Sequence, residues 1–109
     1  MGAGSPGRVT GVWIGWIECD VLLGDVHSLK EKRSVVRPIL AEIRRRYDVS
    51  AIEAGLHDQH RRTLLGIGLV AADRSHLIEV LDAVERLVAS RPEIELLSVR
   101  RRDLHSEDH

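Results

Sequence analysis

The sequence has 109 residues, 43% of them hydrophobic and 30% charged, so it is long and apolar enough to fold as one domain around a core. Its 16 lysines and arginines nearly balance 17 acidic residues, which excludes the uniformly basic profile of a dedicated nucleic-acid clamp. The single cysteine, Cys19, excludes an internal disulfide, and no apolar run is long enough to cross a bilayer. We therefore expect a cytoplasmic protein that is not bound to a membrane.

Hydrophobic periodicity predicts one domain over residues 9–104, between a flexible N-terminal extension (residues 1–8) and a flexible tail (residues 105–109). Six elements are expected within it. In chain order they are a strand from Val9 or Val12 to Leu23, a helix over residues 29–47, strands over residues 49–55 and 62–72 joined by a polar hairpin turn, a helix over residues 74–90, and a strand over residues 94–100.

The first helix is marked by a capping motif and an apolar stripe. Ser28 and Glu31 have the spacing of a capping box, in which the serine hydroxyl accepts from an early helix N–H. Pro38 removes one helical hydrogen bond, so we expect a kink or a tightened turn there. Asp73 is a good N-cap for the second helix. The apolar stripes of the two helices comprise Leu29, Val36, Leu40, Ile43 and Tyr47 in the first and Leu77, Val80, Leu81, Val84, Leu87 and Val88 in the second.

The order strand–helix–strand–strand–helix–strand predicts an α+β fold of the ferredoxin-like type, a four-stranded antiparallel sheet with both helices on one face. The strands of an antiparallel sheet with one solvated face should alternate apolar with polar residues, but here the uncovered face is itself largely apolar in its central region. We therefore expect a homo-oligomer, most simply a two-fold dimer. The alternative is a monomer whose long first strand or tryptophans shade this face. The predicted interface comprises Ile14, Trp16, Leu64, Gly66, Gly68 and Val70.

Basic side chains form a second feature of the first helix. On a helical wheel, Lys30, Arg33, Arg37 and Arg44 lie within about 60° of one another beside the apolar stripe, where they could follow a phosphate backbone. The alternative is an ordinary solvated helix face. The hairpin adds four further candidates for binding RNA or another partner: His57, His60, Arg61 and Arg62. Stacking of bases on the sheet is not expected, because the third strand has no aromatic residue.

Catalytic and metal-binding signals are weak. No set of paired acid and base groups is recognisable, so we expect no enzymatic activity. His57, Asp58 and His60 have metal-ligand side chains, but no further ligand cluster is near them in sequence, and we expect neither a metal site nor a cofactor. Cys19, in the middle of a strand, is expected to be a small core residue.

The most specific local signal is the helix start His27-Ser28-Leu29-Lys30-Glu31-Lys32-Arg33-Ser34-Val35-Val36. With Val49-Ser50 followed by Glu53, with Gly66-Ile67, and with Asp73, Arg74 and His76, it resembles the YlxP-like family, small bacterial proteins without an assigned activity. The resemblance covers about residues 11 to 104. It implies a ferredoxin-like fold and a genomic setting among translation and ribosome-maturation genes.

These features are compatible with two functions from different classes. The first is a non-enzymatic accessory protein that associates with RNA or the ribosome and acts as a homo-oligomer. The second is a small-molecule-sensing or assembly module, with its ligand at a subunit interface formed by sheet edges.

Overall fold

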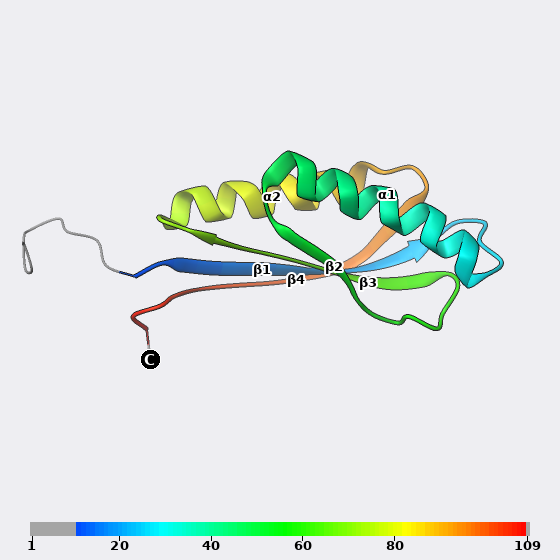
Figure 1. The fold of residues 1–109 in the computed structure, drawn as a ribbon, viewed down its shortest axis with the longest axis horizontal. Coiled ribbons are helices and arrows are strands. Elements are labelled where there is room, and N and C mark those ends of the chain that lie inside the picture. Colours follow the sequence, from blue (N-terminus) through cyan, green and yellow to red (C-terminus); the bar gives the residue numbers. More distant parts are fainter. Residues whose placement is uncertain (1–10, 109) are drawn as a thin grey trace, which may run out of the picture.

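The computed structural model describes residues 11–108, and its elements follow the predicted order (Figure 1). The four strands form one antiparallel sheet in the order β2-β3-β1-β4, with both helices on the same face. This arrangement confirms the predicted ferredoxin-like fold. The elements are β1 (Trp13–Leu23), α1 (Leu29–Tyr47), β2 (Ser50–Gly55), β3 (Arg62–Ala71), α2 (Arg74–Ser90) and β4 (Ile94–His105). The predicted N-terminal extension lies outside the described residues.

Both helices begin at the predicted caps. The Ser28 Oγ accepts from the Glu31 N–H at 3.1 Å, and the Asp73 carboxylate accepts from the His76 N–H at 2.8 Å. Helix α1 continues unbroken through Pro38, which lies on the exposed side of the helix. It ends at Asp48, which adopts the left-handed conformation and donates its N–H to the Arg44 carbonyl.

The core lies between the helices and one face of the sheet. The apolar stripe of α2 is buried, as its spacing predicted, and α1 buries Val36, Leu40 and Ile43 of its stripe together with Ile39. Each such side chain contributes about 1.5–3 kcal/mol of transfer free energy. From the sheet, the buried apolar residues are Ile17, Cys19, Val21, Leu23, Ala51, Leu65, Ile67 and Ala71.

Strand β4 is longer than the sequence predicted. It continues past Arg100 to His105, so the three arginines at 100–102 belong to the strand and alternate between its faces. Arg101 points toward α2 and forms ion pairs with Asp82 and Glu85 at 2.8 and 3.3 Å. The segment expected as a tail begins with the last residue of β4. After it, the Ser106 N–H donates to the Val12 carbonyl at 2.8 Å.

Over the residues described, neither helix is both long and apolar enough to span a membrane.

Candidate binding surfaces

The first candidate surface is one flank of α1. Glu42 points from α1 toward the segment that follows α2, whereas Arg44 reaches the backbone of β2, so the two flanks of the helix face different neighbours. Lys30, Arg33 and Arg37 lie on the β2 side, about one turn apart, and all three are exposed. Among residues 11–108, none of these three cations makes a hydrogen bond or an ion pair. We call this set the basic flank.

Arg44, the fourth predicted member, is used within the fold. Its Nε and Nη2 donate to the Ala51 carbonyl of β2 at 3.1 and 2.6 Å. Because β2 pairs only with β3, this carbonyl lies in an edge strand, where an arginine donor satisfies it. Arg44 therefore supports β2, and the basic flank comprises three cations rather than four.

The hairpin candidates are also divided by the structure. His57 Nε2 lies 3.0 Å from the Glu53 carbonyl oxygen, and Arg61 Nε donates to the carbonyl of Gly24 at 3.0 Å. Arg62 makes a bidentate ion pair with Asp20, with both Nη2–carboxylate distances 2.7 Å. His57 and Arg61 are also exposed, but of the four only His60 is both exposed and without a partner in the described part of the chain. The hairpin lies at the end of the molecule where α1 begins (Figure 1).

The contact between α1 and the hairpin is made by a buried lysine that the sequence reasoning missed. Lys32 is 2% exposed, and its Nζ lies 2.7 Å from both the Glu53 carboxylate and the Leu56 carbonyl. Glu53 also accepts from the Thr63 hydroxyl at 2.8 Å. Burial raises the pKa of Glu53, but the hydrogen bonds from Lys32 and Thr63 and the charge of Lys32 outweigh it and leave the pKa lowered. The network holds the hairpin against the first turns of α1.

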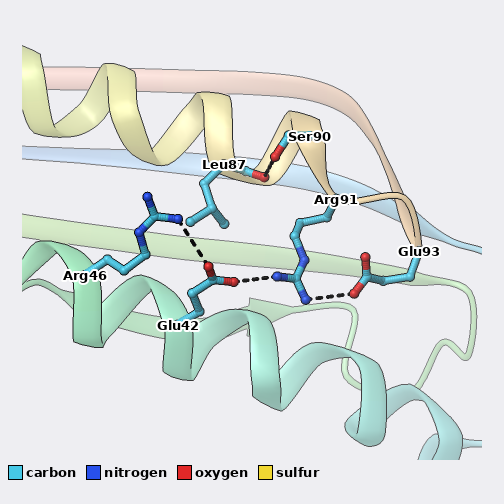
Figure 2. Close-up of polar contacts among 6 residues, drawn as sticks. All are labelled: Glu42, Arg46, Leu87, Ser90, Arg91 and Glu93. Carbon is cyan, nitrogen blue, oxygen red and sulfur yellow. Dashed lines mark hydrogen bonds and ion pairs between the residues drawn. The ribbon is translucent and has the colours of Figure 1, made fainter.

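A groove of about 450 Å³ separates the C-terminal parts of the two helices. Figure 2 shows Glu42 of α1 between two arginines, with Arg46 at 3.2 Å on one side and Arg91 on the other. Arg91 also pairs with Glu93 at 2.8 Å. These cations lie where both helices end, and they complement the partial negative charge of the two helix C-termini. The groove therefore has a structural explanation and does not favour an anionic ligand.

The second candidate surface is the face of the sheet that no helix covers, which we call the back. Strand register brings the six predicted interface residues onto it, since Ile14 lies opposite Val70, Trp16 opposite Gly68, and Glu18 opposite Gly66. Val70 is 64% exposed. The sequence reasoning omitted Ile52, which lies opposite Gly66 and is 57% exposed, and Leu104, which lies opposite Ile14. The alternation of side chains between the two faces of a strand was the sequence signal that could have placed both residues on the back.

Trp16 stands between two hollows on the back. One, of about 630 Å³, is lined by Ile14, Gly68, Val70 and the start of β2. The other, of about 570 Å³, is lined by Glu18 and by the arginines of β4. Both hollows are open, and the half-buried Trp16 lines both of them.

Within residues 11–108, no three His, Cys, Asp or Glu side chains gather closely enough to hold a metal ion. Cys19 is fully buried, and its burial, together with the negative charge of Glu85, raises the pKa of the thiol to about 12. A thiol in that state is a poor nucleophile at neutral pH.

Comparison with known proteins gives the family. The family described as "Protein of unknown function (DUF503)" matches residues 14–101. The chain is also 39% identical over 82 residues to "Uncharacterized protein YlxP" of Bacillus subtilis (strain 168), covering 75% of this chain and 89% of that relative. The chain belongs to the DUF503 family, in agreement with the resemblance drawn from its helix start.

Proposed function

We propose that this DUF503 protein is a non-enzymatic accessory protein of the bacterial cytoplasm that binds structured RNA, on the ribosome or during its maturation, and that it acts as a homo-oligomer. The observation that carries the proposal is the basic flank, whose three exposed cations have no acidic partner in the described chain. The genomic setting implied by the YlxP-like resemblance favours RNA over other polyanions.

The distribution of ion pairs supports this choice. Arg62, Arg74 and Arg101 each face a carboxylate at 3.1 Å or less, so the fold neutralises much of its positive charge locally. Of the exposed cations without an acidic partner in residues 11–108, the basic flank groups three within two turns of one helix, in a chain whose net charge is −1. Cations spaced about one helical turn apart can contact successive phosphates, which positions a protein on RNA without reading its bases. The hairpin that carries the exposed His60 lies at the end of the molecule where α1 begins, and we include His60 in the proposed surface (Figure 1).

The test is binding of a labelled ribosomal RNA fragment by wild type and by the double variant Arg33→Glu/Arg37→Glu. For wild type, three phosphate contacts predict that log K falls against log[salt] with a slope of about −2 to −3, for single-stranded and duplex segments respectively. The double variant should lose most of its affinity at low salt and show a flatter slope. Arg45→Glu/Arg86→Glu is the matched control, because it makes the same change in charge at two exposed arginines outside the flank.

A result in which both double variants bind as wild type does would overturn the role of the basic flank. Equal losses in both would mean that net charge alone attracts RNA. If wild type binds no RNA but is stabilised by a small metabolite in a thermal-shift screen, the small-molecule alternative takes the place of this proposal.

A further inference from the structure

We infer that a second copy of this chain docks face to face on the back of the sheet, with Trp16 of each copy packed against Gly66 and Gly68 of the other. This inference rests on the homo-oligomer part of the proposed function and is independent of RNA binding. It names a second copy as the partner and the back as the surface that this copy binds, and the family description names neither.

Both edges of the sheet are protected against pairing with another strand. On β2, the carbonyls of Ala51 and Glu53 already have donors in Arg44 and His57. On β4, antiparallel pairing with a second copy in the register centred on Arg101 would place two arginine triplets (residues 100–102) opposite each other, and the register shift opposite Asp20 disrupts the edge further. A partner that extends the sheet sideways is therefore disfavoured, and the back is the remaining apolar surface of the sheet.

The back has the size that a stable dimer needs. Four strands about 4.8 Å apart and about ten residues long at roughly 3.3 Å each give a projected area of about 600 Å². The accessible area of a face with protruding side chains exceeds its projection. A standard interface buries about 800 Å² on each partner, so one copy of the back is matched by another of the same dimensions.

The charges on the back favour an uncharged partner. Glu18 pairs with Arg100 at 2.8 Å, and Asp20 pairs with Arg62 at 2.7 Å, so the carboxylates of the central strand are neutralised within the same face. A polyanion would have to compete with these carboxylates for the arginines. A second copy of the same face brings its own neutralised pairs and adds apolar contacts at the exposed Val70 and Ile52.

The shape of the back around Trp16 allows two copies of this surface to fit against each other. Trp16 is half-buried, and its cross-strand neighbour Gly68 and the adjacent Gly66 have no side chains. A two-fold axis lying in the plane of the interface would let the tryptophan of each copy occupy the hollow of the other. Buried aromatic side chains in such pockets supply much of the energy of protein interfaces.

Sedimentation equilibrium of the full chain at micromolar concentration tests the inference. Wild type should sediment with about twice the 12.2 kDa chain mass. Val70→Glu places a charge on an already exposed position, and it should raise the dimer dissociation constant on the order of a hundredfold. Gly68→Glu is a second variant that the monomer can accommodate, because a Cβ there would meet its nearest atoms at 3.5 and 3.7 Å. The control is Ala41→Glu, at an exposed position of α1.

Each outcome decides a different point. A monomeric wild type overturns both this inference and the homo-oligomer part of the proposed function, while RNA binding stands or falls by its own assay. A dimeric wild type whose Val70→Glu and Gly68→Glu variants, folded by circular dichroism, remain dimeric overturns docking on the back but not oligomerisation. Dissociation of both variants, with Ala41→Glu still dimeric, supports the inference.

Discussion

Replacing the buried Lys32 by methionine tests how the hairpin is fixed to α1. The change removes the cation 2.7 Å from Glu53 and the donor to the Leu56 carbonyl, while the apolar stem is largely kept. Breaking a buried pair by removing one partner costs about 3–5 kcal/mol. Glu53 keeps 20% of its side chain exposed and retains the hydrogen bond from Thr63, so we expect the lower end, about 3 kcal/mol.

Urea unfolding followed by circular dichroism at pH 7 measures this loss, and Tm should fall by roughly 12 °C for a chain of this size. The double variant Lys32→Met/Glu53→Met removes the stranded carboxylate as well. It should therefore unfold at a higher urea concentration than Lys32→Met alone, which separates the cost of an unpaired charge from the cost of lost packing.

The pH dependence provides an independent check. Because the pKa of Glu53 is lowered in the folded protein, its contribution to the free energy of unfolding is complete above the ordinary glutamate pKa and is lost as the pH falls through the lowered value. The difference in stability between wild type and Lys32→Met should therefore shrink below about pH 4. A cost under about 1 kcal/mol at pH 7, or a difference that is unchanged at low pH, would refute the assignment of a working ion pair.

Two substitutions and one labelling experiment test the local structure further. Gly15→Ala should cost about 1–3 kcal/mol in urea unfolding, since a Cβ there would lie 2.8 Å from Leu77 Cδ2, and a neutral result would contradict the close contact between β1 and α2. Cys19 should react with a thiol reagent only as fast as the protein unfolds, and rapid labelling of the native state would contradict its burial. Asp48→Gly should stabilise the protein by about 0.5 kcal/mol in thermal unfolding, because Asp48 has φ 51°, and destabilisation would show that its side chain matters more than its backbone.

Local patterns in the sequence were sufficient for most of the fold. The apolar stripe of α2 and the caps at Ser28 and Asp73 depend on residues three or four apart, and such short spacings are visible in a single sequence. Strand β4 was predicted to end at Arg100, whereas it continues through Arg101 and Arg102 to His105. In the structure these arginines keep the alternation of a strand, with Arg101 facing the carboxylates of α2.

The candidate site was only partly predictable, because it depends on partners that are distant in sequence. Lys32 lies among charged neighbours and looks solvated, yet its partner Glu53 is brought to it by the turn of the chain into β2. Helical spacing grouped Arg44 with the basic flank, but the Ala51 carbonyl that it binds belongs to another element. A helical wheel gives the direction of a side chain and not what it meets there.

Lysine footprinting with the RNA bound tests the central claim most directly, because the chain has only two lysines, at 30 and 32. Free protein treated with an acetylating reagent and analysed by mass spectrometry should be modified at the exposed Lys30 and protected at Lys32, which is 2% exposed. Adding a ribosomal RNA fragment should protect Lys30 as well, as expected if the basic flank contacts phosphates. Equal acetylation of Lys30 in free protein and in a demonstrated RNA complex would contradict the account.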